Sequence, residues 1–407
     1  MTITRSTTRS CLLLATLLLG CGGSRVPIPA VTPFVSSYVP LKRENFQRVI
    51  NGEPVDLYTI SNRRGMVVRI TNYGAKIEQI VVPDRDGRFG DVVLGYETLE
   101  GVQAGQPSMG AFMGRYAGRI AGGTFSLDGV PYTLSLNEAA RNNTMHGGPM
   151  GARTRVFSAN QLSPSRVQMT MVFRHAEDAQ TSPVAVTGFP GTLSMQVTYS
   201  VTEQNELRLE YSATTDRKTV LNLTTHPFFN LSNTPGSSVF GHVISINADR
   251  VLEVNSLLRP TGVLRNVAGT PMDFRVAKPL GQDIATAYDQ LRLIDPAGAY
   301  DHTYVVNSAP GGALTRVAMA SEPTSGRTLE VWSTEPGVHL LSAPSLNGLA
   351  PRDVGKGGVA YPKSSGFCLE PMHFPDSPNQ PAFPSTMLDA GATYRGEIVF
   401  RFGTQAR

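Results

Sequence analysis

Cysteine is scarce in this sequence, and its few positions exclude several kinds of site. The 407 residues include three cysteines, Cys11, Cys21 and Cys368. None belongs to a CxxC pair, and no two histidines have the spacing of zinc ligands, so the usual signatures of a zinc site are missing. If export removes Cys11 and modifies Cys21, only the Cys368 thiol remains and no intramolecular disulfide can form.

Common catalytic and cofactor-binding motifs are also missing. The sequence has no GxSxG nucleophile elbow, no HExxH motif and no GxxxxGK[ST] loop. The segment DVGKGG (353–358) is the nearest approach to a phosphate loop, but no Ser or Thr follows its lysine. We therefore expect neither a metal nor a cofactor, and acid/base chemistry is what remains if the protein is an enzyme.

Charged residues are few, at 17% of the chain, and the net charge is only +4. No run of Lys or Arg stands out, so nothing favours nucleic acid as a partner. Gly and Pro are abundant instead, with 40 and 29 residues, which indicates many turns.

Several segments alternate apolar and polar residues, as strands with one buried face do. The clearest are 67–83, which reads as two strands joined by a turn, and 166–174, 193–201 and 207–215. No βαβ rhythm and no internal repeat is visible, and one short helix is expected in LGQDIATAYDQL (280–291). The pattern predicts an all-β fold: a single large antiparallel β-sandwich with few short helices.

The N-terminus has the features of an export signal. Arg5 and Arg9 precede an apolar run at 11–20 that is too short to span a bilayer. Leu18-Leu19-Gly20-Cys21 then resembles a bacterial lipobox. We expect a signal peptide at 1–20, a lipid anchor at Cys21, a Pro/Gly/Ser-rich tether at 21–42 and the folded domain at 43–405. The protein would then be exported to the bacterial periplasm or envelope, and a plain secretory signal is the alternative.

An ionisable residue ends the apolar run of GFCLEPMHFPDSPN (366–379), where Glu370 follows Phe367-Cys368-Leu369. A buried carboxylate must be paired, hydrated or used. Other residues with unusual neighbours are His226 before Pro227, His146 before two glycines, Asp301 and Arg119. Each also has a structural explanation, as a turn residue, a cap or half of an ion pair, and spacing alone does not show that they meet.

Seven motifs, taken in this order, resemble those of the aldose 1-epimerase (galactose mutarotase) family. They are GRYAGRIAGGTF (114–125), NNTMHGG (142–148), NLTTHPFFNLS (222–232), GTPMDFR (269–275), YDHTYVV (300–306), STEPGVHL (333–340) and GFCLEPMHFPDSPNQPAFPS (366–385). The resemblance covers residues 43 to 402. It implies a β-supersandwich with an open sugar cleft and an enzyme that interconverts the α and β anomers of free aldoses such as glucose and galactose, without metal or cofactor.

The resemblance also implies roles for single residues. Glu370 matches the catalytic base of the family and His226 the catalytic acid. Arg119, His146 and Asp301 match residues that hold sugar hydroxyls, and His339 takes the place of a sugar-contacting glutamine.

The chemistry suits these residue types. Ring opening removes a proton from the anomeric hydroxyl and delivers one to the ring oxygen, and a His with a pKa of about 6.5 can donate near neutrality. A Glu with a pKa of about 4.3 is a weak base unless burial raises its pKa, which the apolar run before Glu370 could do.

The sequence departs from the family around this set. Gly118, Thr225, Phe228, His339 and Met372 stand where amide or other polar side chains are usual, and Ser342-Ala343-Pro344 replace a Thr-Gly-Asn stretch. Since amides recognise hydroxyls by direction, these changes leave the preferred sugar open.

Two other functions fit the same residues. Glu370 and Asp301 could form the carboxylate pair of a glycoside hydrolase, which requires a separation of about 5–10 Å. The second of these alternatives is a sugar-binding envelope protein without catalysis, and the altered cleft motivates it.

Overall fold

A computed structural model describes residues 38–182, 184–307 and 312–406, all within one compact unit of the chain. The expected signal peptide, the Cys21 anchor and most of the expected tether lie outside these residues. The first element is the short 3₁₀ helix η1 (Arg43–Phe46).

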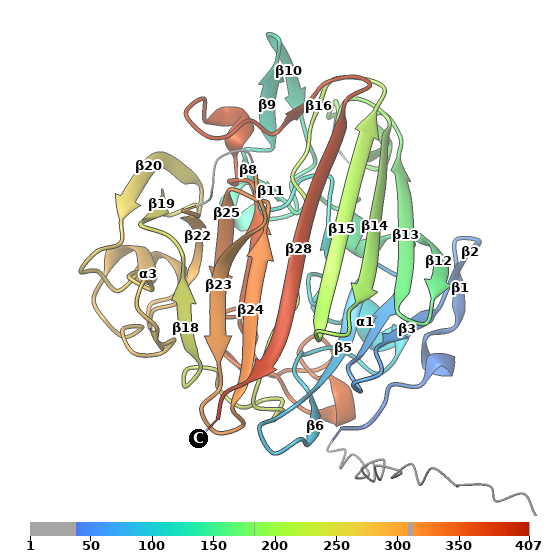
Figure 1. The fold of residues 1–407 in the computed structure, drawn as a ribbon. Helices are drawn as coiled ribbons and strands as arrows, with labels where there is room; N and C mark the ends of the chain where they lie inside the picture. Colours follow the sequence, from blue (N-terminus) through green and yellow to red (C-terminus); the bar gives the residue numbers. More distant parts are fainter. Residues whose placement is uncertain (1–37, 183, 308–311, 407) are drawn as a thin grey trace, which may run out of the picture. The chain divides into compact units, whose positions relative to one another are not determined.

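The alternating segments form a nine-stranded antiparallel sheet (Figure 1). Strand β28, from the end of the chain, lies between β15 and β24 and joins the two halves of the sheet. In order across the sheet, the strands are β12 (Ser158–Ser163), β13 (Arg166–Phe173), β14 (Leu193–Val201), β15 (Glu206–Thr215), β28 (Thr393–Thr404), β24 (Arg327–Ser333), β23 (Thr315–Ser321), β18 (Val243–Ile246) and β21 (Lys278–Pro279).

Two smaller antiparallel sheets accompany it. The five-stranded sheet consists of β20 (Pro260–Asn266), β19 (Arg250–Val254), β22 (Asp301–Val305), β25 (Gly337–Leu341) and β26 (Cys368–Met372). The four-stranded sheet consists of β3 (Leu57–Ser61), β4 (Val67–Thr71), β5 (Lys76–Pro83) and β6 (Phe89–Asp91). The two strands expected in 67–83 are therefore present as β4 and β5.

The remaining elements are short. Five two-stranded ribbons pair β1 (Arg48–Ile50) with β2 (Glu53–Val55), β7 (Phe112–Met113) with β17 (Thr224–Thr225), β8 (Arg119–Ala121) with β11 (Asn143–Met145), β9 (Thr124–Leu127) with β10 (Val130–Thr133), and β16 (Thr219–Val220) with β27 (Met387–Leu388). The α-helices of the described residues are α1 (Leu99–Ala104), α2 (Glu177–Thr181) and α3 (Asp289–Ile294). None of these helices is long and apolar enough to cross a membrane.

One hydrophobic core joins the three sheets. Fully buried side chains from the four-stranded sheet (Ile77), the nine-stranded sheet (Leu209 and Phe400) and the five-stranded sheet (Leu340) belong to the same packed cluster. Alternation produces this core, because strands such as β13 and β15 point every second side chain inward. The expected antiparallel β-sandwich with few short helices is confirmed.

The prediction of a helix at 280–291 is wrong for most of this segment. Residues 280–286 form hydrogen-bonded turns, with Gln282 N donating to Pro279 O and Thr286 N to Asp283 O at 3.0 Å each. Asp283 also pairs with Lys278 Nζ at 2.6 Å. These local bonds compete with a helix that would be too short to be stable by itself, so α3 begins only at Asp289.

Candidate active site

Three adjacent strands place the polar side chains of the site in one row. Thr303 on β22 lies opposite His339 on β25, and His339 lies opposite Glu370 on β26. Residues two apart on a strand share a face, so Asp301 lies on the same face as Thr303, and Cys368 on the same face as Glu370. The alternation of a buried sheet thus brings a carboxylate to the middle of β26.

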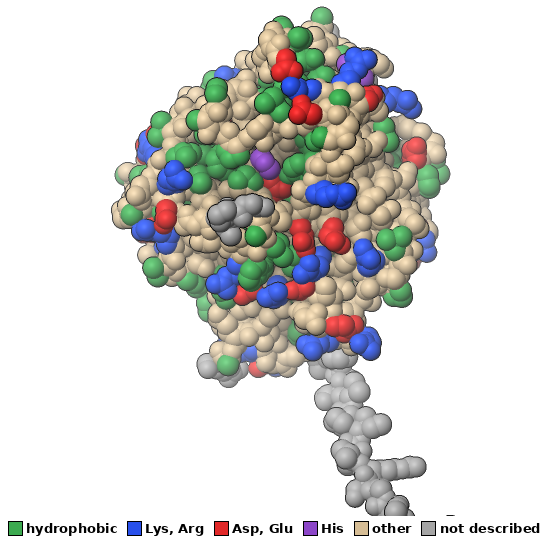
Figure 2. All heavy atoms as spheres, turned by 45° about the horizontal axis from the view of Figure 1, so that its top comes forward, with side chains coloured by type: hydrophobic (Ala, Val, Ile, Leu, Met, Phe, Trp, Pro, Cys, Tyr) green, Lys and Arg blue, Asp and Glu red, His purple; other side chains and the backbone are tan. Residues whose placement is uncertain are grey.

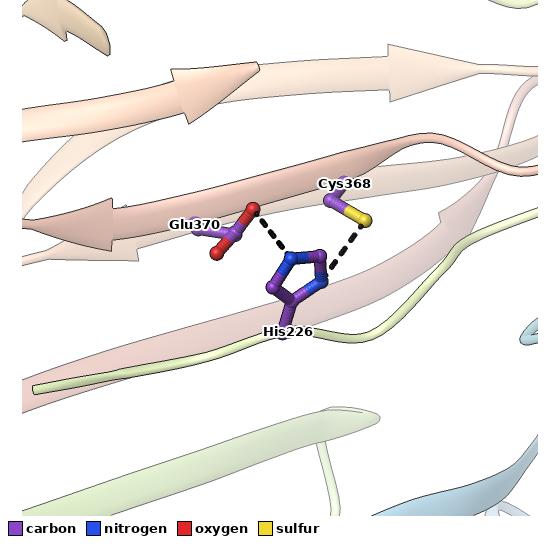
Figure 3. Close-up of side chains that lie close together, drawn as sticks. All are labelled: His226, Cys368 and Glu370. Carbon is purple, nitrogen blue, oxygen red and sulfur yellow. Dashed lines mark hydrogen bonds and ion pairs between the residues drawn. The ribbon is translucent and has the colours of Figure 1, made fainter. Parts of the chain in front are cut away.

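His226 reaches this row from the other side. Its backbone N–H donates to Ala111 O at 2.9 Å, directly after β17, and the Thr224 hydroxyl donates to Pro371 O at 2.7 Å, which ties β17 to β26. The imidazole then lies against β26, with Nε2 3.3 Å from Glu370 Oε1 and Nδ1 3.4 Å from Cys368 Sγ (Figure 3). The two residues expected to form the acid/base pair are therefore in contact.

Burial controls the charge of this pair. Only 1% of the Glu370 side chain is exposed, and burial, followed by the nearby Asp301 charge, raises the pKa of Glu370 well above its usual value. Burial also lowers the pKa of His226 to about 3, below the ordinary value assumed from the sequence. Burial therefore favours the neutral form of each group. The expected desolvation of Glu370 is present.

Glu370→Gln should make the protein more resistant to unfolding as the pH rises. The pKa of Glu370 is raised in the folded state, so its carboxyl adds no penalty below the unfolded value of about 4.3. Above that value the wild type loses up to about 1.4 kcal/mol per pH unit relative to the glutamine variant, until the folded pKa is reached.

Melting temperatures between pH 5 and pH 8 measure this difference. We expect the variant's advantage over the wild type to grow with pH, whereas Glu53→Gln, at an exposed position on β2, should give no such trend. A gap that stays constant or shrinks as the pH rises would contradict the buried, proton-retaining carboxyl.

The other predicted residues surround the pair. The Arg119 Nε and Nη2 groups donate to Glu138 at 2.9 and 3.0 Å, and Nη2 lies 3.5 Å from Asp301 Oδ2. His339 Nε2 is 2.7 Å from Asp301 Oδ1, and His339 Nδ1 is 2.9 Å from the Thr303 hydroxyl. Although burial raises it, the pKa of Asp301 is held far below its usual range by the Arg119 charge and the His339 contact. Asp301 is therefore an ionised acceptor.

His146 completes the set. Its Nδ1 accepts a hydrogen bond from the Gly118 backbone N–H at 3.3 Å, and its ring lies edge-on to the His226 ring at 5.6 Å. The six predicted site residues all line one cavity of about 510 Å³, a size typical of small-molecule sites. They are Arg119, His146, His226, Asp301, His339 and Glu370.

Five of the departures from the family pattern line this cavity, namely Gly118, Phe228, His339, Pro344 and Met372, whereas Thr225, Ser342 and Ala343 do not. Phe228 stacks on the His226 ring at 5.0 Å, and Met372 is buried in the cavity wall. Gly118 has a φ of +75°, and a Cβ there would lie 2.9 Å from Pro375 Cγ. These positions supply apolar surface or backbone groups to the cavity in place of side-chain amides.

Sequence analysis missed several contacts. Cys368 is not among the predicted site residues, although its place two residues before Glu370 on a strand predicts a shared face. Glu138, in the loop after β10, and Arg153, in the short 3₁₀ helix η3 (Ala152–Thr154), also line the cavity, and the sequence of neither segment indicates this role.

His226, Cys368 and Glu370 could be read as metal ligands, since one atom of each lies within 4.8 Å of the others. The geometry does not suit one ion. Cys368 contacts Nδ1 and Glu370 contacts Nε2, so the ring lies between the two side chains (Figure 3). A metal–ligand distance of about 2.0–2.3 Å to all three would require the imidazole to turn out of this position.

Comparisons with known proteins agree with the geometry. The sequence profile of the family described as aldose 1-epimerase matches residues 56–401. Galactose mutarotase of Bos taurus is 36% identical over 82% of this chain and 90% of that protein. Aldose 1-epimerase of Escherichia coli K12 is 32% identical over 86% of this chain and 96% of that protein.

Solved structures show the same fold. A GalM/aldose epimerase homologue from C. elegans superimposes with a TM-score of 0.76 at 28% identity, covering 86% of this chain and all of that one. Galactose 1-epimerase from Lactobacillus acidophilus gives 0.74 at 22% identity, covering 89% and 98%. The matched region includes Glu370, His226 and the residues around them, and the chain belongs to the aldose 1-epimerase family.

Proposed function

We propose that Glu370 and His226 carry the reaction of this enzyme, an aldose 1-epimerase that interconverts the α and β anomers of free aldoses. The observation that carries the assignment is the 3.3 Å contact between His226 Nε2 and Glu370 Oε1 inside a cavity of sugar-binding size. The second oxygen, Glu370 Oε2, is buried and has no hydrogen-bond partner among the described residues. It is therefore placed to accept from a sugar hydroxyl.

Ring opening and closure require Glu370 and His226 to hold one exchangeable proton between them. Once the proton has moved from Glu370 to His226 Nε2 across their 3.3 Å contact, Glu370 takes the proton of the C1 hydroxyl while His226 Nε2 gives a proton to the ring oxygen, and the C1–O5 bond breaks to leave an aldehyde. The C1–C2 bond rotates, the C5 hydroxyl attacks the other face of the aldehyde, and the two groups return their protons in exchanged roles. The protonated imidazole with ionised Glu370 and the neutral imidazole with protonated Glu370 hold the same number of protons, so the pair can work in either direction.

The surrounding charges hold the sugar. Asp301 accepts from hydroxyls, and Arg119 and His339 fix its position from both sides. The His146 and His226 rings also lie against each other, with centroids 5.6 Å apart. This arrangement suits a polyol with several hydroxyls within reach of one cavity.

The alternative of a glycoside hydrolase is not favoured. That reaction requires a protonated acid and, across the bond that breaks, an ionised carboxylate that is free to attack the anomeric carbon or to activate a water. Glu370 could be the acid, but the Asp301 carboxylate is already engaged by Arg119 Nη2 at 3.5 Å and His339 Nε2 at 2.7 Å. New reducing ends released from a disaccharide would be the result that supports hydrolysis.

Saturation-transfer NMR between anomers tests the function directly. We expect the protein to raise the exchange rate of at least one sugar among glucose, galactose, xylose, arabinose and fucose well above its spontaneous rate. Sugar binding without faster exchange would instead indicate a binding protein.

We also propose that the enzyme is exported and held at the bacterial envelope by a lipid on Cys21. The support is the apolar run at 11–20 and the Leu18-Leu19-Gly20-Cys21 motif after two arginines. In cell fractionation the wild-type protein should sediment with membranes, and Cys21→Ala should move it to the soluble fraction. The same distribution of the two proteins between membrane and soluble fractions, or a cytosolic wild type, would contradict the lipid anchor.

A further inference from the structure

One basic side chain in the cavity wall lacks a counter-charge. Arg153 lies in the 3₁₀ helix η3 (Ala152–Thr154), shortly after the His146-Gly147-Gly148 segment, and is 7% exposed. Its Nη1 donates to the Ser108 hydroxyl at 3.0 Å, and its Nε is buried without a hydrogen-bond partner. Within the described part of the chain, no carboxylate oxygen lies close enough to the Arg153 guanidinium, at 4.0 Å or less, to form an ion pair.

Other arginines show how unusual this is. The remaining arginines that line the cavity each pair with a carboxylate, namely Arg119, Arg141 and Arg352. Arg115, which is equally buried elsewhere, donates to Pro190 O, Gly191 O and the Thr219 hydroxyl. Arg153 has a single neutral hydroxyl in place of such partners.

A buried guanidinium without a counter-charge favours the binding of an anion. An uncompensated buried charge is unfavourable, and a carboxylate or phosphate that reaches it forms strong charge-assisted hydrogen bonds. Burial lowers the pKa of Arg153 to about 10, so the group still carries its charge at neutral pH. Since Arg153 lines the same cavity as the acid/base pair, the anion would belong to the bound sugar.

The position of Arg153 indicates which end of the sugar it faces. Gly151, two residues before Arg153, packs so closely against His146 O that a Cβ would clash with it. Ser108 O accepts from Ala111 N–H, and Ala111 O accepts from His226 N–H at 2.9 Å, so Ser108 lies beside the His226 segment. Asp301 instead contacts Arg119 and His339, and His339 lies opposite Glu370 on the neighbouring strand. The cleft therefore has Asp301 and Arg119 near the base and Arg153 on the histidine side. In the proposed reaction Glu370 meets the C1 hydroxyl and His226 meets the ring oxygen. The other carbon bonded to that oxygen is C5, which carries C6.

We infer that Arg153, with the Ser108 hydroxyl, binds a carboxylate at C6, and that the preferred substrate is a hexuronate rather than a neutral hexose. The inference rests on the proposed function and adds the substrate class. One guanidinium matches the single charge of a carboxylate, whereas a phosphate dianion in this buried place would need further cations.

Anomer exchange over matched pairs of sugars tests the inference. D-galacturonate and D-glucuronate should exchange with kcat/KM at least about 10-fold above D-galactose and D-glucose, since a hydrogen bond to a charged group is worth about 10- to 100-fold. A preference for the neutral hexoses would overturn the inference and leave the epimerase function intact. A preference for the hexose 6-phosphates would overturn the assignment of a carboxylate. If no sugar exchanges faster than it does spontaneously, the epimerase function fails, and the inference fails with it.

Two variants separate charge recognition from a structural role. Arg153→Met should remove about 10- to 100-fold of kcat/KM for the uronates and change the neutral hexoses less than about 3-fold, and Arg153→Lys should restore part of the loss. Without sugar, Arg153→Met should unfold at the same or a higher temperature, because it removes an uncompensated buried charge. Equal losses for charged and neutral sugars, or a strongly destabilised methionine variant, would contradict the inference.

Discussion

Glu370→Gln is expected to lower kcat for anomer exchange by about 10³-fold, within the range of a lost general base. The amide keeps the volume and the contact with His226, but it cannot accept the C1 proton. Because Glu370 is buried and its neighbours are fixed by strand pairing, no other carboxylate can move into its place. Saturation-transfer NMR at saturating sugar measures the loss, and KM should change little because the amide can still hydrogen-bond a hydroxyl.

A matched control is available for this variant. Glu322 is also buried, and its carboxylate accepts from the Thr324 and Ser325 backbone N–H groups away from the cavity. Glu322→Gln should leave kcat unchanged. Wild-type turnover in the Glu370→Gln variant would show that the base has been assigned to the wrong residue.

His226→Asn is expected to lower kcat by about 10²- to 10³-fold, because the proton for the ring oxygen is then no longer delivered by a positioned group. The asparagine can still hydrogen-bond but cannot transfer a proton in this pH range. The pH dependence should change as well. The wild-type pair titrates as a unit, whereas the residual activity of the variant should follow the titration of Glu370 alone.

The control for this variant is His175→Asn. His175 is exposed, accepts from the Gly191 backbone N–H and does not line the cavity. Its replacement should leave the exchange rate unchanged. If His226→Asn retained wild-type kcat and its pH profile, His226 would not be the acid.

The sequence predicts the strands well where apolar and polar residues alternate over a long segment. It fails where local hydrogen bonds and ion pairs determine the backbone conformation. Segments 166–174, 193–201 and 207–215 form neighbouring strands β13, β14 and β15 because half of their residues must be buried. Residues 280–286 have a helix-like composition, but turn hydrogen bonds and the Lys278–Asp283 ion pair hold them in another conformation. Such competition depends on neighbours that no local pattern contains.

The site was predictable in part, for a similar reason. The family motifs identify Glu370 and His226, but they are 144 positions apart, and only the pairing of β25 with β26 and the β17 junction bring them together. The isolation of Arg153 could not be predicted at all. The lack of a counter-charge depends on the tertiary packing, in which no distant segment places a carboxylate next to Arg153.

On the face drawn in Figure 2, the charges of the described residues do not indicate a partner. Figure 2 shows one face of the molecule, on which Lys and Arg side chains are interspersed with Asp and Glu rather than gathered into a stripe. The residues that carry function are instead those buried around one cavity, which is the usual arrangement for a small-molecule enzyme.

The central claim is that Glu370 and His226 act as one proton-transferring unit, and a double-variant comparison tests it most directly. Exchange rates of Glu370→Gln, His226→Asn and the double variant should be measured by saturation transfer, with enough enzyme for catalysed exchange to exceed the spontaneous rate. Residues that work as a unit show strongly non-additive losses, so the double variant should be about as slow as the slower single variant. Losses that multiply in the double variant would show that the two groups act independently and would contradict the account.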